Sequence, residues 1–336
     1  SGECIHIFRG HTTHPHVVSF QRERGQYASI DDDRIARLWD AAQAGDGRQW
    51  GRPHLFFFGV GNFSPDGRRF AVGCSDGHAR VIDLQTWRPV DTWKIDPMGG
   101  HGALFSPDGR LIVTIGRTSV ARIRSAETGQ ELLGLEGHTD GIPCAAFSPD
   151  SSRVVTASWD GTCRVWSTET GRTECVVDCG AEPWEAAFLP DGQRFLAGIQ
   201  TGELILWSVT GQRLHAARGH DDAVDALAVS PDGRHAATSG RDGHLVLWDI
   251  ATFRPIWRVR TQSERVYSAV FTFDGRRVII GGKGIIEVWD VTTGRRTLMW
   301  EAHGGSIFGL ALSRQPEGLL ASTSSDGLIR LWPIAR

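Results

Sequence analysis

Residues 137–178 read GHTDGIPCAAFSPDSSRVVTASWDGTCRVWSTETGRTECVVD, and this stretch decides the fold. Four short β-rich runs, at 142–147, 153–158, 162–166 and 173–177, alternate with turns rich in Gly, Pro, Asp and Ser. Alternating apolar and small residues predict strands, and the intervening turns are short enough for hairpins. The stretch therefore predicts one four-stranded antiparallel sheet in about 42 residues.

The third strand of this unit ends at a tryptophan, and that marker recurs along the whole chain. Its eight positions, with Ile82 and Arg124 as the weaker copies, are Trp39, Ile82, Arg124, Trp166, Trp207, Trp248, Trp289 and Trp332. Strand-built repeats of this length predict an array in which each unit packs on its neighbours. We therefore expect an all-β fold, an eight-bladed β-propeller of four-stranded antiparallel blades, with residues 1–336 as a single domain.

The two ends of the chain suggest how such a ring closes. The last unit has no fourth strand after Trp332, whereas residues 3–9 precede Gly10-His11 just as a fourth strand precedes Gly137-His138. We expect this N-terminal strand to complete the C-terminal blade, because the ring would otherwise retain an open edge.

Charge and hydropathy restrict the partners. The net charge is −3, the arginines form no run, and no apolar stretch approaches the roughly 20 residues of a membrane span. We therefore expect neither a nucleic-acid nor a membrane partner. The six cysteines lie at expected strand positions and show no zinc-binding spacing, apart from a weak CxxxC pattern at Cys175 and Cys179. We therefore expect buried, reduced thiols and a cytoplasmic location.

A second set of residues recurs with fixed spacing: a His, a Ser or Thr, an Asp four residues after the hydroxyl residue, and a Trp six residues after the Asp. The four complete sets are His11, Ser29, Asp33 and Trp39; His138, Thr156, Asp160 and Trp166; His220, Thr238, Asp242 and Trp248; and His303, Ser322, Asp326 and Trp332. These residues resemble the WD40 repeat family, and the resemblance covers the whole chain. It implies a hydrogen-bonded tetrad in each of these four units.

The Asp, His and hydroxyl of each tetrad also resemble a hydrolase triad. An enzyme needs one active site, whereas this combination occurs four times, each time with a Trp. A triad is defined by geometry and roles rather than by residue types. We therefore interpret the tetrads as structural and expect no catalytic residues and no enzyme activity.

The resemblance also implies a binding face. In the family, the rim of the central channel is lined by the position four residues before the residue that closes the first strand, here His16, Gly59, His101, Pro143, Trp184, Asp225, Tyr267 and Phe308. The position before the turn Asp adds Trp159 and Arg241. We expect a protein or peptide partner to contact Trp159, Trp184, Tyr267, Phe308, Asp225, His16, His101 and Arg241. The alternative is that the aromatic residues only fill the channel.

Metal and cofactor sites are not expected. His11, His14 and His16 lack a nearby Cys, Asp or Glu that would complete a ligand set. The run Asp31-Asp32-Asp33 lies in a loop too short to wrap a calcium ion.

The function that these patterns favour is a non-catalytic recognition module. The chain begins Ser1-Gly2 without a methionine and uses arginine far more than lysine, so we expect a monomeric sensor or scaffold domain of a larger bacterial signalling protein. One alternative is a hydrolase-like enzyme in the channel, built on Asp225 with His16 or His101. The other is a structural spacer without a ligand.

Overall fold

The computed structural model describes residues 100–312 without a gap. Outside that range it describes residues 6–9, 15–21, 26–31, 35–40, 48–51, 60–66, 68–73, 77–83, 88–95, 319–324 and 328–333. The described residues form thirty β-strands and no helix, and so none that could cross a membrane.

Four sheets each contain four consecutive antiparallel strands. They are β2 (Pro15–Gln21), β3 (Gln26–Asp31), β4 (Ile35–Asp40) and β5 (Arg48–Gly51); β14 (Cys144–Phe147), β15 (Arg153–Ala157), β16 (Thr162–Ser167) and β17 (Thr173–Asp178); β18 (Pro183–Phe188), β19 (Arg194–Ile199), β20 (Glu203–Ser208) and β21 (Arg213–Arg218); and β22 (Val224–Val229), β23 (His235–Gly240), β24 (His244–Asp249) and β25 (Arg254–Arg260).

Two larger sheets contain the other strands. The first holds β6 (Val60–Phe63), β7 (Arg69–Gly73), β8 (His78–Asp83), β9 (Arg88–Lys94), β10 (Gly100–Phe105), β11 (Leu111–Gly116), β12 (Ala121–Ser125) and β13 (Glu131–Leu135); the second holds β26 (Val266–Phe271), β27 (Arg277–Asp290), β28 (Arg296–Leu312), β29 (Leu319–Ser324), β30 (Leu328–Pro333) and β1 (His6–Arg9). Parallel pairing of β6 with β10 joins two repeats in the first sheet. In the second, the long β28 pairs first with β27 and then with β29.

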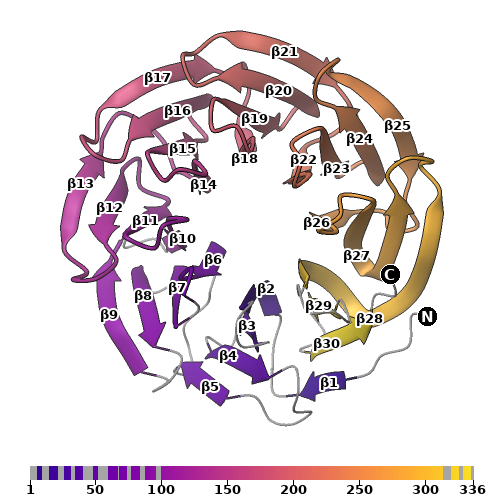
Figure 1. Ribbon diagram of the computed structural model, residues 1–336, viewed down its shortest axis with the longest axis horizontal. Coiled ribbons are helices and arrows are strands. Elements are labelled where there is room, and N and C mark those ends of the chain that lie inside the picture. Colours follow the sequence, from indigo (N-terminus) through magenta and orange to yellow (C-terminus); the bar gives the residue numbers. More distant parts are fainter. Residues whose placement is uncertain are drawn as a thin grey trace.

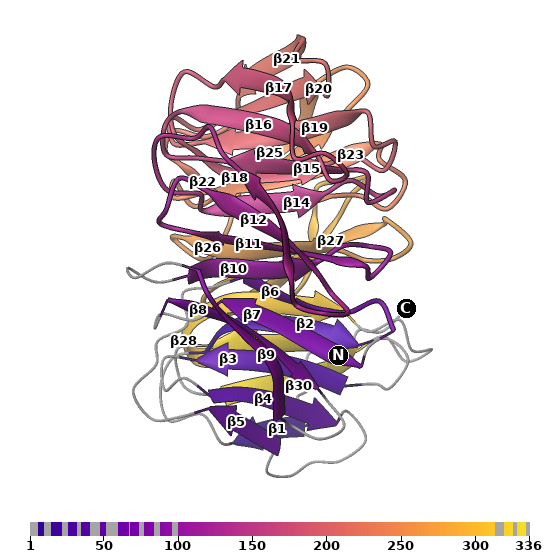
Figure 2. The ribbon, with the colours of Figure 1, turned by 90° about the vertical axis from the view of Figure 1, so that its left-hand side faces the viewer.

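The sheets are arranged around a common centre (Figure 1). β14, β18, β22 and β26 lie nearest the centre, and β17, β21 and β25 lie at the periphery. Figure 2 shows the same sheets from the side. β1 pairs antiparallel with β30, with His6 opposite Leu331, so this sheet takes an outer strand from the other end of the sequence.

The recurring Ser-Pro-Asp-Gly turn joins the innermost strand of a sheet to the next strand. In the copy between β14 and β15, the Ser148 hydroxyl donates to Asp150 and accepts from the Arg153 backbone amide. Ser151 takes a φ of 64° at the position where Gly109 takes 74° in the copy between β10 and β11. Glycine suits that position because the left-handed region carries a steric cost for other residues.

The core lies between neighbouring sheets. Val155 and Val165 pack with Phe195 and Ile205 across the boundary between β14–β17 and β18–β21. Leu196, Leu206 and Trp248 pack across the next boundary. The three sheets from β14 to β25 thus each bury both faces, as the repeat spacing predicts.

Candidate functional site

The predicted rim positions coincide with β-bulges near the start of the innermost strands. In β18, the pairing with β19 passes from Pro183 to Glu185, so Trp184 is the extra residue of a bulge. Five other strands show the same shift. The six bulge residues are His16, His101, Trp184, Asp225, Tyr267 and Phe308. A bulge turns the side chain of its extra residue away from the direction that it would have in a regular strand.

The structure describes the side chains of three of these six residues. They are Trp184 on β18, Asp225 on β22 and Tyr267 on β26, of which Trp184 and Tyr267 are half-buried. The side chains of His16, His101 and Phe308, and the whole of Gly59, lie outside the described residues.

Asp225 lies between two arginines, and we call these three residues the arginine clamp. Arg241 Nε donates to Asp225 Oδ1 at 3.0 Å, and Arg265 Nε donates to Oδ2 at 2.6 Å. The Asp225 side chain is only 6% exposed, whereas those of Arg241 and Arg265 are 29% and 37% exposed. The groups that face solvent here are therefore the two cationic guanidiniums, and they cover the Asp225 carboxylate.

An aromatic ring supports each arginine of the clamp. The Arg241 guanidinium lies 4.5 Å from the centre of the Trp184 ring, and the Arg265 guanidinium lies 4.9 Å from that of Tyr267. Cation–π contact adds to the hydrogen bonds at Nε. The result is a continuous network of four predicted rim residues and Arg265 across β18, β22 and β26.

Arg265 was not among the predicted binding residues. It lies two residues before the Tyr267 bulge, in the turn that leads into β26. Its sequence signal is an arginine at a turn position that Glu182 and Ala223 occupy in the neighbouring repeats. That signal is weak, because arginine is common on exposed turns.

Trp159 packs away from this network. A Cβ added to Gly141 would lie 2.8 Å from the Trp159 ring and 3.2 Å from the Arg117 backbone, so Gly141 is enclosed between them. The Trp159 amide also donates to the Gly141 carbonyl at 3.0 Å. Its indole is half-buried and covers the loop before β14.

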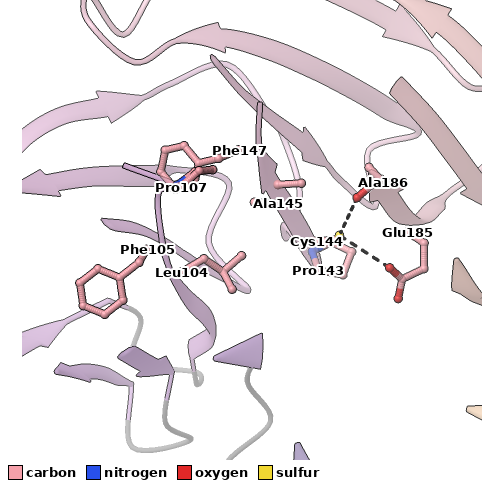
Figure 3. Close-up of a pocket in the computed structure, with 10 residues that line it drawn as sticks. Leu104, Phe105, Pro107, Pro143, Cys144, Ala145, Phe147, Glu185 and Ala186 are labelled. Carbon is pink, nitrogen blue, oxygen red and sulfur yellow. Dashed lines mark hydrogen bonds between the residues drawn. The ribbon is translucent and has the colours of Figure 1, made fainter. Parts of the chain in front are cut away.

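A pocket of about 480 Å³ lies between β10, β14 and β18 (Figure 3). Its apolar wall includes Leu104, Phe105 and Phe147, and the predicted rim residue Pro143 also lines it. Glu185 and Cys144 supply its polar atoms, with Cys144 Sγ 3.9 Å from Glu185 Oε2 and 3.7 Å from the Ala186 carbonyl.

Burial favours the neutral forms of the two polar side chains of the pocket. Burial and the charge of Asp225 raise the pKa of the Glu185 carboxyl to about 7. Burial and Glu185 raise the pKa of the Cys144 thiol, which makes it a poor nucleophile because the reactive form is the thiolate.

The tetrad of the β14–β17 sheet forms a continuous hydrogen-bond chain. Trp166 Nε1 donates to Thr156 Oγ1 at 2.8 Å. His138 Nε2 lies 2.8 Å from Thr156 Oγ1, and its Nδ1 lies 2.8 Å from Asp160 Oδ2. A carboxylate can only accept, so His138 Nδ1 carries the proton and Nε2 accepts from the Thr156 hydroxyl. One neutral tautomer therefore satisfies every member.

The protonation states agree with this assignment. Burial lowers the pKa of His138 despite the attraction of Asp160, so the imidazole is neutral. Burial alone would raise the pKa of Asp160, but hydrogen bonds from Thr162, the Thr139 amide and His138 lower it to about 2. Thr156 is fully buried and lies beneath Trp166, which leaves no room for a substrate at its hydroxyl.

Two further tetrads are described in whole or in part. In the β22–β25 sheet, Trp248 and His220 both bond to Thr238, and His220 Nδ1 lies 3.1 Å from Asp242 Oδ1. At β29 and β30, His303 and Trp332 bond to Ser322 at 2.8 Å each. Asp326, His11, Asp33 and the side chains of Ser29 and Trp39 lie outside the described residues.

The described residues contain no group of three His, Cys, Asp or Glu that could hold a metal ion. His14 and Asp32 lie outside them. Among the described cysteines, the close pair is Cys163 and Cys179, with sulfur atoms 3.7 Å apart.

Comparison with known proteins identifies the repeat. The family described as WD domain, G-beta repeat matches residues 58–83, 129–167, 211–249 and 294–333. No curated protein matches the chain. Its fold is similar to the crystal structure of the computationally designed Ika8 protein, crystal packing No.1 in P63, with a TM-score of 0.86 and 20% identity over 99% of this chain and 100% of that chain. Four segments of the chain thus match the WD40 repeat family, and the four-stranded antiparallel sheets are consistent with a β-propeller.

Proposed function

We propose that this chain is a non-catalytic recognition module that binds a protein or peptide partner at the rim. WD40 repeats generally mediate protein–protein interaction, and the matched segments extend along the chain. The observation that carries the proposal is the network of Trp184, Arg241, Asp225, Arg265 and Tyr267. It holds partly exposed aromatic and cationic groups at bulges, where anchors of an interface would lie. His16, His101, Phe308 and Trp159 complete the proposed surface.

The architecture that we propose for this surface is a closed ring of eight blades formed by residues 1–336 as one domain. Three features support it: eight evenly spaced third-strand ends, the fusion of neighbouring repeats by β28 and by the β6–β10 pair, and the pairing of β1 with β30. In this arrangement all rim bulges face one end of the central channel.

The setting that we propose is a cytoplasmic, monomeric sensor or scaffold domain within a larger bacterial signalling protein. The composition supports it, through the excess of arginine over lysine and cysteines suited to a reducing compartment. The full open reading frame would test this part directly, because it would reveal any effector domain.

The binding proposal can be tested with peptides selected on the protein from a random dodecapeptide display library. Alanine at Trp159, Trp184, Tyr267 or Phe308 should weaken binding, by about 30-fold at an anchor residue, because interface aromatics carry most of the binding energy. The controls are Asp66→Ala and Asp108→Ala, at turns on the far end of the inner strands. If only the turn variants weakened binding, the partner would occupy the other face and the rim aromatics would only fill the channel.

A further inference from the structure

The arginine clamp carries information about the chemistry of the partner. Both guanidiniums donate to Asp225 through Nε, and no bond to Asp225 uses a terminal Nη group. Within the described part of the chain, no side chain accepts a hydrogen bond from those Nη groups. The two arginine side chains remain about a third exposed, so an acceptor can reach them from solvent.

Charge favours an anion at this point. Two guanidiniums face one carboxylate, so the clamp has one excess positive charge below about pH 7, where the neighbouring Glu185 keeps its proton. The Glu264–Lys283 ion pair beside β26 is neutral as a unit. A cationic group of a partner would meet two arginines before it could reach the covered Asp225, and like charges at close range are unfavourable.

Trp184 adds an independent observation. Its Nε1 is buried and has no acceptor among the described residues, although the ring lies against Arg241. A buried donor without an acceptor destabilises the structure that contains it. Within the residues that the structure describes, the network therefore has donors on Trp184, Arg241 and Arg265 and no side-chain acceptor besides Asp225.

We propose that the arginine clamp binds a side-chain carboxylate of an acidic peptide segment, an inference that rests on the proposed rim function and specifies its partner. Guanidinium groups recognise carboxylates through two parallel N–H···O bonds. Asp225 and the rings of Trp184 and Tyr267 orient both guanidiniums before the ligand arrives, which lowers the entropic cost of binding. A single carboxylate matches the single excess charge of the clamp.

The dodecapeptide selection tests this inference through the composition of the selected pool. Peptides that depend on Trp184 for binding should be enriched in Asp and Glu. Replacing the key Glu of a selected peptide by Gln should weaken binding about tenfold or more, the range of a charge-assisted hydrogen bond. Arg265→Gln should produce a similar loss, and the two changes together should cost less than their sum.

A matched control separates the clamp from general electrostatics. Arg234→Gln removes the same charge from the exposed turn between β22 and β23, where the side chain is 81% exposed. This variant should bind the selected peptide like the wild type. Circular dichroism and thermal melting of Arg265→Gln show whether this variant remains folded. Arg265→Lys provides a second variant, which keeps the positive charge but lacks the planar guanidinium that can donate two parallel hydrogen bonds.

Three outcomes would overturn the inference. If the peptides that depend on Trp184 were neutral or basic, binding at the rim would be supported, but binding of a carboxylate by the clamp would be refuted. A pool in which phosphoserine versions bind and Glu versions do not would assign the clamp to phosphate. If no rim variant weakened the binding of any selected peptide, both the carboxylate site and the proposed rim function would be refuted.

Discussion

The sheet β14–β17 and its neighbour β18–β21 differ in what holds their tryptophans. Trp166 donates to Thr156 within a complete tetrad. Trp207 occupies the same place in the next sheet, where Ala197 replaces the hydroxyl residue, and its Nε1 is buried with no described partner. Both rings nevertheless lie in the core, at 1% and 6% exposure. The packing of a sheet thus does not require the tetrad, which cross-links its strands in addition.

The same contrast recurs between the repeat of β22–β25, which has a tetrad, and the repeat that begins with β26 and β27, which lacks one. There Trp289 Nε1 also has no acceptor among the described residues, but the buried Glu287 accepts from Arg296 and from the Gln262 amide. Asp225 lies in the repeat with a tetrad, while Trp184 and Tyr267 lie in the two neighbouring repeats without one. Trp289 is nevertheless buried like Trp248, so the ring keeps its place in the core without the tetrad.

The largest test removes residues 1–9. His303, Ser322 and Trp332 are bonded together at β29 and β30. If these bonds alone stabilised this part of the sheet, the protein would tolerate the loss of residues 1–9. We expect instead a loss of about 3 kcal/mol or more and aggregation, because the edge of β30 becomes unpaired. Urea unfolding and light scattering would measure both. An unchanged transition with a monodisperse sample would refute the structural importance of the β1–β30 pair.

The second test compares Asp242→Ala with Thr201→Ala, which lies at the corresponding position of β18–β21. Asp242 accepts from His220, the Asp221 amide and Arg258, so its loss leaves the buried His220 and two more exposed donors without this acceptor. We expect a cost of about 2–3 kcal/mol for Asp242→Ala and almost none for the exposed Thr201. Equal melting temperatures for the two variants would contradict the structural role of the tetrad.

The third test uses pH and concerns Glu185 in the pocket beside the clamp. Its pKa of about 7 in the folded protein lies above the ordinary value near 4.5, so the folded state retains the proton between these two pH values. The free energy of unfolding should therefore fall as pH rises from 4.5 to 7, by about 1–3 kcal/mol from this group. The groups that act on Glu185 are Asp225 on β22 and Cys144 on β14. In Glu185→Gln this part of the pH dependence should disappear, and a curve that still matched the wild type would assign it to other groups.

The features that the sequence predicted are those set by local spacing. Strand content and the positions of the tetrads follow from a repeat of 41 to 43 residues. The count of four residues back from Phe188 or Phe271 also identified Trp184 and Tyr267, which proved to be bulge residues.

The features that the sequence did not predict depend on contacts between repeats. Asp225 lies 16 residues from Arg241 and 40 from Arg265, and no local pattern links the three. The CxxxC spacing singled out Cys175 and Cys179, but Cys179 follows the last residue of β17, and its sulfur lies 3.7 Å from that of Cys163 on β16. The expected separate blades are joined by β28 and by the β6–β10 pair, because backbone pairing continues across the repeat boundary there.

The smallest and most specific test compares Trp166→Phe with Trp207→Phe. Both changes remove a similar part of a buried ring, so the packing cost is similar and cancels in the difference. Trp166→Phe also removes a hydrogen bond to Thr156, whereas Trp207→Phe removes a donor that has no described acceptor. Trp166→Phe should therefore cost about 1 kcal/mol more than Trp207→Phe in urea unfolding. The reverse order would mean that the Trp207 indole has an acceptor in solution, and the contrast between the two sheets would then lie in packing alone.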